Sequence, residues 1–462
     1  MRFKTASLGC KVNQYETQWI RTTLIANGWE DADAEGADVE PENVDLAIVN
    51  TCSVTSESDA KSRKLVSHFA REYPAAKIVV VGCWAASARD EVAKTPNVFA
   101  FEPDKRKLPE LLQSLGATYF PTAIDSFAER RRAYVKVQDG CRVGCAYCII
   151  PQTRPYLKSR PILETLEEAR ALAANGCREI VLTGIHLGHY GLDFCPPTPE
   201  EIALGDAFDP NASFPLETYL ARRALTHESD RVDLASLLRA LVELKLPLVR
   251  FRLGSLEAVE VGDRLLDVAQ ERPDAVCPHF HLSMQSGDDE ILRAMKRRWA
   301  SAPYIEKCQE IIERIPDVAL STDVIVGFPG ETDAQFERTV EVVRRVGFSK
   351  THVFRFSARP GAEASTLPRQ VPPETKKARC AELMKVAQEE REKYARRFVG
   401  RDARMIVESV GLSAGRRVAR GTTERYYDAE APLEGDATVK LGDVARVKLV
   451  GLSGDVFQGR LL

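Results

Sequence analysis

The chain has 462 residues, of which 44% are hydrophobic and 28% charged, and its formal net charge is −3. This length predicts about three domains, and the charge argues against a uniformly basic nucleic-acid-binding protein. No run of about 18 apolar residues supports a membrane span. The first residues lack a secretory pattern, so we expect a cytoplasmic protein whose 11 cysteines stay reduced and free to bind metal.

The first 120 residues alternate between strand and helix patterns. Gly28 and Pro74 stand directly after the two expected helices, as is typical of helix ends. The alternation predicts an α/β domain with a parallel sheet covered by helices. The expected strands are 2–8, 46–50 and 77–81, and the expected helices are 13–27 and 56–73.

Three cysteines follow these strands, each by about two residues: Cys10, Cys52 and Cys83. The carboxyl ends of parallel strands share one edge, where ligands bind, so the three thiols should converge in space. Gly9 and Gly82 leave room for a bulky ligand. Buried free cysteines are the alternative interpretation, but the shared strand-end position favours a three-cysteine metal site.

Three other cysteines are closely spaced along the chain, at Cys141, Cys145 and Cys148. Thiolates at this spacing can hold three irons of a 4Fe–4S cluster, and no fourth cysteine lies nearby to bind the last iron. The open iron can therefore bind a further ligand. A structural zinc site would need a second, distant pair of cysteines, and disulfides are not expected in a reducing compartment.

The middle of the chain repeats strand and helix units, which predicts a full or partial (β/α) barrel. A linker is expected at 125–132 and an acidic surface insertion at 191–232, where eight acidic residues face three basic ones. A loop of this length is usually functional or mobile. The expected strands are 134–138, 179–183, 251–253, 279–283 and 323–326, and the expected helices are 164–175, 234–244, 289–296, 304–314 and 334–346.

The last part of the chain begins with a charged helix at 376–398 and continues with short alternating segments at 404–408, 438–441 and 444–450. This pattern predicts a small antiparallel β-barrel. Some such barrels bind nucleic acid through cations and stacking surfaces, although tyrosines in a small β domain are more often core residues. The candidates are Arg416, Arg417, Arg420, Arg425, Tyr426 and Tyr427.

The string Cys141-x3-Cys145-x-Tyr147-Cys148 resembles the signature of radical S-adenosylmethionine (SAM) enzymes. The resemblance extends to the methylthiotransferase family over nearly the whole chain, through the strings SLGCKVNQYE at 7–16, NTCSVT at 50–55, HLSMQSG at 281–287 and DVIVGFPGET at 323–332. It implies an N-terminal methylthiotransferase domain at 1–120, a radical SAM partial barrel at 130–372 and a TRAM-like RNA-binding barrel at 376–462. The insertion at 191–232 is longer than this family leads us to expect.

The resemblance also implies roles for particular residues. Cys141, Cys145 and Cys148 would hold a SAM-binding 4Fe–4S cluster, and Cys10, Cys52 and Cys83 a second cluster that carries the sulfur to be transferred. One SAM would supply the methyl group and another the radical. The SAM pocket is expected to include Tyr147, Gly184, Ser255, Glu257, Gln285 and Gly327, although packing is an equal alternative for Ser255, Glu257 and Gln285. The remaining cysteines are expected to be structural: Cys177, Cys195, Cys277, Cys308 and Cys380.

Within the family, Lys11 and Val12 after Cys10 resemble the branch that acts on N6-threonylcarbamoyladenosine at position 37 of tRNA. The alternatives are methylthiolation of isopentenyladenosine in tRNA or of a ribosomal-protein aspartate. An iron–sulfur RNA-binding or electron-transfer protein and a radical SAM methyltransferase that transfers no sulfur are further alternatives. The expected partners are the tRNA anticodon loop, a flavodoxin- or ferredoxin-like electron donor and a sulfur donor, with no membrane.

Overall fold

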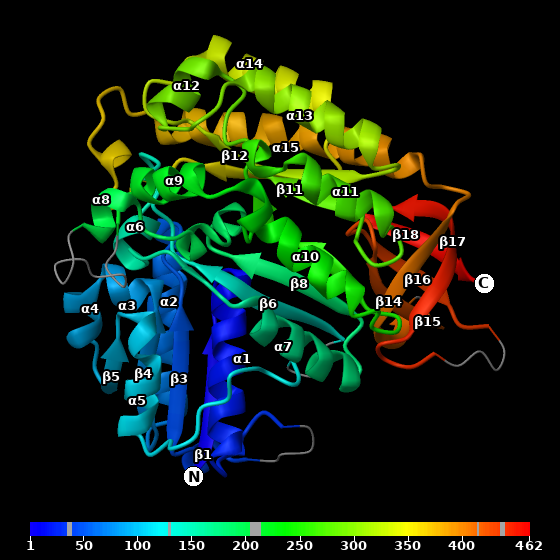
Figure 1. The fold of residues 1–462 in the computed structure, drawn as a ribbon. Coiled ribbons are helices and arrows are strands. Elements are labelled where there is room, and N and C mark those ends of the chain that lie inside the picture. The colour runs from blue at the N-terminus through cyan, green and yellow to red at the C-terminus, as the bar shows by residue number, and fades with distance from the viewer. Residues whose placement is uncertain (35–38, 128–130, 204–213, 414, 435–438) are drawn as a thin grey trace.

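The computed structural model describes residues 1–34, 39–127, 131–203, 214–413, 415–434 and 439–462. Three β structures follow one another along the chain, and Figure 1 shows the N-terminal sheet and the C-terminal barrel at different sides of a central partial barrel. The predicted α/β class is therefore confirmed. In the part of the chain that is described, no helix is both long and apolar enough to cross a membrane.

The N-terminal sheet has five parallel strands in the order β2-β1-β3-β4-β5. Every residue of β3 is buried, because helices cover both faces of a parallel sheet. The prediction found β1, β3 and β4 but missed β5 and the short helices after Cys83. The strands are β1 (Arg2–Ser7), β2 (Glu30–Asp31), β3 (Leu46–Thr51), β4 (Lys77–Gly82) and β5 (Val98–Glu102), and the helices are α1 (Lys11–Ala26), α2 (Ser56–Glu72), α3 (Cys83–Ser87), α4 (Arg89–Ala93) and α5 (Leu108–Ser114).

The central part contains two four-stranded sheets, in the orders β7-β6-β8-β9 and β10-β11-β12-β13. All pairs are parallel except β6 with β7, and a bridge between Phe251 and Val276 brings the two sheets together. The predicted partial barrel is confirmed. Its strands are β6 (Arg132–Asp139), β7 (Lys158–Ser159), β8 (Glu179–Gly184), β9 (Arg250–Leu253), β10 (Ser255–Leu256), β11 (His279–Leu282), β12 (Ala319–Val326) and β13 (Lys350–Arg355).

Helices cover the outside of the partial barrel (Figure 1). Their inward faces supply Leu, Val and Ile side chains to one large core cluster shared with the strands, as expected for amphipathic helices on a parallel sheet. The helices are α6 (Ile150–Thr153), α7 (Ile162–Ala174), α10 (Leu234–Glu243), α11 (Asp263–Glu271), α12 (Asp289–Ala294), α13 (Ser301–Arg314) and α14 (Asp333–Val346).

The acidic insertion is more ordered than its sequence indicated. Its described residues include α8 (Pro199–Ile202) and α9 (Leu216–Leu225). Leu216 and Tyr219 are buried against Leu157, and Arg142 donates a hydrogen bond to the carbonyl of Phe214 at 3.0 Å. The insertion therefore packs against the cysteine-bearing segment of the barrel. Residues 204–213 of the insertion and 128–130 of the predicted linker lie outside the described residues.

The C-terminal part consists of α15 (Pro373–Arg396) followed by a closed five-stranded barrel in the order β14-β15-β16-β18-β17. Neighbouring strands are antiparallel except β16 and β18, which are parallel. The expected strand at 438–441 is absent from the described residues 439–441. The strands are β14 (Asp402–Ser413), β15 (Arg416–Thr423), β16 (Asp428–Pro432), β17 (Val444–Ser453) and β18 (Val456–Leu461).

Candidate active site

Cys141, Cys145 and Cys148 lie on the loop between β6 and α6. Gly140 opens this loop with a φ of +77°, and a Cβ there would lie 1.4 Å from the carbonyl oxygen of Tyr156. Only glycine allows this close approach. The three cysteines line a cavity of about 210 Å³, so the loop presents its thiols to an open space beside the barrel strands.

Four of the six predicted SAM-pocket residues line this cavity together with the cysteines: Tyr147, Ser255, Glu257 and Gln285. Gly184 and Gly327 do not line it. A Cβ at Gly184 would lie 2.9 Å from the Gln138 side chain, and one at Gly327 would lie 2.2 Å from Lys376 Cγ. These two glycines therefore make room for neighbouring side chains at other places in the fold.

Gly184 contributes to the cysteine loop through Gln138. The Gln138 side chain donates hydrogen bonds to the carbonyls of Asp139 and Gly140, at 2.9 and 2.8 Å. It also accepts one from the backbone N–H of His186 at 2.8 Å. These hydrogen bonds fix the backbone immediately before Cys141, so the buried Gln138 amide holds the start of the cysteine loop in place.

Arg297 is a site residue that sequence reasoning missed. Its guanidinium donates to Cys145 Sγ at 3.3 Å and to the Tyr147 hydroxyl at 3.3 Å, and it pairs with Glu257 at 3.0 Å. It lies 3.9 Å from the ring centroid of Trp299. A fixed positive charge is thus held against the thiols. Burial raises the pKa of Cys148 to about 12, and the charge of Arg297 opposes this rise. Nothing in the local Lys-Arg-Arg sequence distinguishes this arginine from a solvated one.

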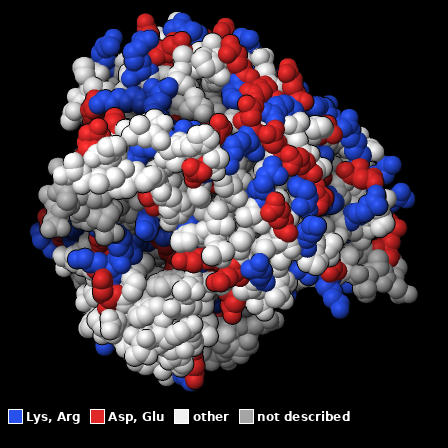
Figure 2. Space-filling model, in the orientation of Figure 1, with Lys and Arg blue, Asp and Glu red and all other residues white. Residues whose placement is uncertain are grey.

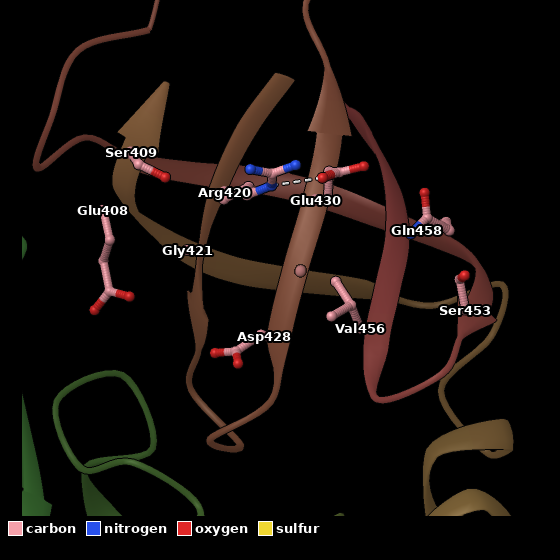
Figure 3. Close-up of a pocket in the computed structure, with 10 residues that line it drawn as sticks. Glu408, Ser409, Arg420, Gly421, Asp428, Glu430, Ser453, Val456 and Gln458 are labelled. Carbon is pink, nitrogen blue, oxygen red and sulfur yellow. Dashed lines mark hydrogen bonds and ion pairs between the residues drawn. The ribbon is translucent and has the colours of Figure 1, made fainter. Parts of the chain in front are cut away.

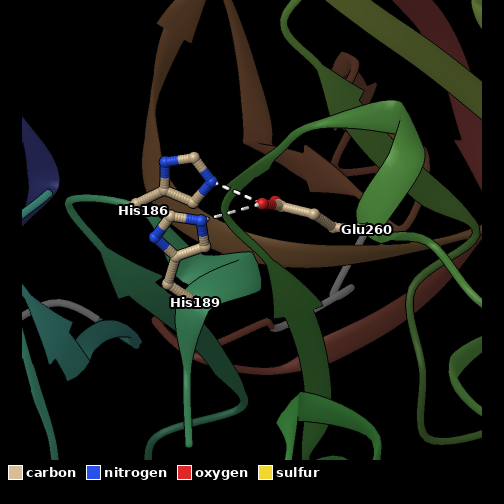
Figure 4. A group of neighbouring side chains, drawn as sticks. All are labelled: His186, His189 and Glu260. Atoms are coloured by element: carbon tan, nitrogen blue, oxygen red, sulfur yellow. Dashed lines mark hydrogen bonds and ion pairs between the residues drawn. The ribbon is translucent and has the colours of Figure 1, made fainter. Parts of the chain in front are cut away.

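His186, His189 and Glu260 form a cluster of polar side chains (Figure 4), and His186 places this cluster beside Cys141. His186 Nδ1 lies 3.5 Å from Cys141 Sγ, and its Nε2 lies 2.6 Å from Glu260. The two imidazole rings stack at 3.6 Å. Burial opposes ionisation of Glu260, but the charge of His186 lowers its pKa to about 2. Arg298 donates to the same carboxylate at 2.9 Å, so this group is an ion-pair network and disfavours a bound cation.

The N-terminal cysteines come together as the sequence predicts. Cys10 is the N-cap of α1 after β1, Cys52 follows β3 directly, and Cys83 begins α3 after β4. These three strands are neighbours in the sheet. At Gly9, where φ is +98°, a Cβ would lie 2.6 Å from Cys52 Sγ, so glycine is needed where the loops meet.

The electrostatics of these cysteines also indicate a shared site. Cys10 is exposed at the surface, but loss of solvation by the surrounding protein raises the pKa of its thiol to about 11; Arg154 opposes this rise, and Cys83 adds to it. Burial likewise raises the pKa of Cys52, with a further contribution from Cys83. Iron binds thiolates, so cluster binding would release these protons. Three convergent, mutually interacting thiols with a glycine at the junction fit a cluster ligated by three cysteines.

Arg154 joins the N-terminal sheet to the partial barrel. Its guanidinium is fully buried and donates to Glu16 at 2.8 Å, to Asp139 at 2.6 Å and to the Asn13 side chain at 3.1 Å. Lys105 donates to the other oxygen of Glu16 at 2.6 Å. This network fixes α1, which begins at Cys10, against β6, which ends just before Cys141.

A second cavity, of about 200 Å³, lies between the Cys148 loop and the segment that follows Cys52. Val54 and Thr55 line it from the Cys52 side, and Cys148 lines it from the other. Tyr147, Cys148 and Gln285 line both this cavity and the first. Gln285 has a φ of +69°, a strained backbone conformation that often occurs at functional sites. A molecule in this cavity would therefore contact Cys148 and the segment that follows Cys52.

Two family models match the chain: the Radical SAM superfamily over residues 135–343 and Uncharacterized protein family UPF0004 over residues 2–101. Threonylcarbamoyladenosine tRNA methylthiotransferase MtaB of Thermotoga maritima is 32% identical over 416 residues, which cover 87% of this chain and 85% of that relative. The chain belongs to the radical SAM methylthiotransferase family. It is an enzyme, and SAM and 4Fe–4S clusters are its cofactors.

Two further similarities concern this methylthiotransferase. The tRNA-2-methylthio-N(6)-dimethylallyladenosine synthase of Aquifex aeolicus is 29% identical and covers 100% of this chain and 98% of its own. The radical SAM methyltransferase TsrM from Kitasatospora setae has a TM-score of 0.53 at 13% identity, over 79% of this chain and 74% of that one. The TsrM likeness confirms the fold.

The C-terminal barrel of the methylthiotransferase does not present all of its predicted RNA-binding residues. Tyr427 is buried in the barrel core, and Arg425 pairs with Glu424 at 2.6 Å. Arg420 pairs with Glu430 at 2.6 Å in a surface cavity of about 480 Å³ that is also lined by Glu408 and Asp428 (Figure 3). This acidic cavity is poorly suited to phosphate. Arg416 and Arg417 are also exposed on β15 and, unlike Arg420, form no ion pair within the described residues.

The helical face of the partial barrel is also unsuited to RNA. Figure 2 shows basic and acidic side chains interspersed over it, without a large patch of one sign. Arg314 on α13, for example, pairs with Asp263 and Asp267 on α11. A nucleic-acid surface normally has a local excess of Lys and Arg, so RNA is expected on another face.

Proposed function

We propose that this enzyme converts N6-threonylcarbamoyladenosine at position 37 of tRNA, beside the anticodon, to its 2-methylthio derivative. The cavity lined by Cys148, Val54 and Thr55 is the observation that carries this proposal, because a base held there would lie beside Cys148 and beside the segment that follows Cys52. The name of the Thermotoga maritima relative supports the choice of nucleoside.

In this proposal the two cysteine groups hold one cluster each. Cys141, Cys145 and Cys148 would bind the cluster that contacts SAM, and Cys10, Cys52 and Cys83 the cluster that carries sulfur. When bound, these cofactors supply the radical, methyl and sulfur chemistry that side chains lack, since no side chain has a pKa suited to removing an aromatic C–H proton.

The remaining side chains bind and orient. Arg297 and Glu257 form an ion pair beside Cys145. This pair would fix the positions of a positive and a negative charge in the SAM pocket. Tyr147 and Gln285 form the wall shared by the two cavities, which would align SAM with the base. The Arg154 network fixes the separation of the two groups, and positioning to within about 1 Å is a large part of such catalysis.

The adenine would enter as an unstacked loop base, the form of RNA that proteins read specifically. A TRAM-like domain at 376–462 would add phosphate contacts through Arg416 and Arg417, so tRNA affinity should fall with salt. An N-terminal domain at 1–120 and a radical SAM domain at 130–372 would hold the two clusters. A flavodoxin- or ferredoxin-like electron donor, a sulfur donor and a cytoplasmic location complete the proposal.

Mass spectrometry of tRNA nucleosides from cells with and without this protein tests the proposal. We expect 2-methylthio-N6-threonylcarbamoyladenosine to disappear without it and the unmodified N6-threonylcarbamoyladenosine to accumulate. Loss of 2-methylthio-isopentenyladenosine instead would favour the second candidate, which the Aquifex aeolicus relative's full-length similarity supports. If neither nucleoside changed, a tRNA substrate would be excluded.

A further inference from the structure

Lys11 is a cation without a counter-ion. It is the first residue of α1, directly after Cys10, and its side chain is partly enclosed. Within the described ranges, its ammonium makes no hydrogen bond or ion pair. Its contact is with the ring of Tyr426, whose centroid lies 5.6 Å away. An enclosed charge without a partner is costly, which indicates that an anion binds here in the working complex.

The surroundings of Lys11 are rich in positive charge. Arg132 and Arg252 lie over the same Tyr426 ring, at 5.5 and 4.7 Å. Each of these arginines already has an acidic partner: Arg252 pairs with Glu179 at 2.8 Å, and Arg132 pairs with Glu408 at 3.4 Å. The nearby acidic groups are therefore used, and Lys11 is the surplus cation.

Lys11 and the cavity beside Cys148 share one neighbour. The charge of Asp323 acts on Lys11, and Asp323 lines that cavity. The Asp323 carboxylate is itself occupied, because His281 Nε2 lies 3.0 Å from it. Since Lys11 follows Cys10 in the chain, its ammonium lies within one side-chain length of Cys10. An anion bound to the ammonium would therefore lie near Cys10.

We propose that Lys11 binds the carboxylate of the threonylcarbamoyl group on the target adenine. This inference rests on the proposed function. In adenine, C2 and the carbon that carries N6 flank the same ring nitrogen, so a base with C2 toward Cys10 has its N6 substituent nearby. A threonylcarbamoyl group carries a carboxylate and a dimethylallyl group carries no charge, so Lys11 would distinguish the two substrates.

The test compares RNAs that differ only in this charge. Anticodon stem–loops would carry N6-threonylcarbamoyladenosine, its carboxylate methyl ester or N6-isopentenyladenosine, and their Kd for the reconstituted holoenzyme would be measured by fluorescence anisotropy. We expect the wild type to bind the acid about tenfold or more tighter than the ester, as a charged hydrogen bond provides. Lys11→Met should bind the acid and the ester equally, and Lys11→Arg should keep the preference.

Two controls make the result specific. Lys77→Met removes another lysine that packs on an aromatic ring, 4.8 Å from Phe99, and should leave the acid preference intact. Iron content and the electron paramagnetic resonance (EPR) spectrum of Lys11→Met should match the wild type. If Lys11→Met loses iron, Lys11→Gln is tested in its place and should likewise bind the acid and the ester equally.

The outcomes separate this inference from the proposed function. A wild type that prefers the acid, together with a Lys11→Met variant that also prefers it, would overturn the role of Lys11 alone. Equal weakening for acid and ester would assign Lys11 to the RNA backbone and would also overturn it. A wild type that prefers the isopentenyl RNA would instead overturn the proposed function.

Discussion

Arg154 connects, through side-chain hydrogen bonds, the two elements that adjoin Cys10 and Cys141. Its partners Glu16 and Asp139 lie on α1 and β6, the elements adjacent to Cys10 and Cys141. Both carboxylates are buried and keep Lys105 and Lys136 as partners when the arginine is removed, so the cost is the loss of several buried, charged hydrogen bonds.

We therefore expect Arg154→Met to lower the free energy of unfolding by about 3–5 kcal/mol and to reduce the iron bound per chain. Arg154→Lys should recover only part of the loss, since lysine cannot donate a bidentate fork. Urea denaturation and iron analysis check this. Arg106→Met, at an exposed pair with Asp104, should change stability by less than about 0.5 kcal/mol; an equal effect at both sites would contradict the role of Arg154.

Arg297 contacts the cysteine group formed by Cys141, Cys145 and Cys148. Its hydrogen bond to Cys145 Sγ at 3.3 Å stabilises electron-rich sulfur, and such bonds raise the reduction potential of a cluster. Arg297→Met should therefore shift the midpoint potential of this cluster to more negative values, as followed by EPR-monitored titration. Arg293→Met, an exposed position on α12, is the control. An unchanged or more positive potential in the Arg297 variant would refute the assignment.

At the scale of elements, Phe354 and Arg355 at the end of β13 line the cavity that Cys148, Val54 and Thr55 also line. Phe354 on β13 is 42% exposed and lines both this cavity and a larger outer groove of about 430 Å³, which Arg355 and Lys376 also line. An exposed aromatic side chain beside two cations is suited to a stacked RNA base and its phosphate.

Phe354→Ala should thus weaken binding of an anticodon stem–loop by about tenfold, since stacking on an aromatic ring contributes about 1–3 kcal/mol per base. Phe99→Ala removes an aromatic side chain that is 57% exposed on β5 and should leave the Kd unchanged. Anisotropy at fixed salt measures both. Similar Kd values for the two variants would place the RNA elsewhere.

Elements with strong local patterns were predictable, and those defined by distant contacts were not. The apolar runs of β3 and β4 gave the strand ends that place Cys52 and Cys83. In contrast, β16 and β18 are short and become strands through pairing within the closed barrel. Gly184 and Gly327 resembled ligand-pocket glycines, but their neighbours Gln138 and Lys376 come from other parts of the chain, which a local pattern does not reveal.

At the scale of the whole molecule, one buried carboxylate fastens the C-terminal barrel to the partial barrel. Glu179 on β8 accepts from Arg250 at 2.7 Å and from Arg252 at 2.8 Å. The same arginines donate to the carbonyls of Thr422 and Glu424, each at 3.0 Å. Glu179 thus orients two arginines that hold the β15–β16 turn.

Burial opposes ionisation of Glu179, but Arg252 and Arg250 lower its pKa well below the usual range. The folded pKa is below the unfolded value of about 4.3, so its stabilisation is complete above that pH and is lost as pH falls further. Glu179→Gln should cost about 3–5 kcal/mol near pH 7, and the difference in urea midpoint from wild type should shrink below about pH 4. A difference that stays constant with pH would contradict this.

The central claim is that the cluster held by Cys141, Cys145 and Cys148 makes the radical and that the cluster held by Cys10, Cys52 and Cys83 supplies the sulfur. Anaerobic reaction of reconstituted enzyme with SAM, dithionite and tRNA, followed by mass spectrometry of all products, tests it most directly. The account predicts that a Cys10/Cys52/Cys83→Ala variant releases 5′-deoxyadenosine but forms no 2-methylthio nucleoside. Cys141→Ala should form neither product, and Cys380→Ala should form both. A 2-methylthio nucleoside made by the N-terminal triple variant would contradict the claim.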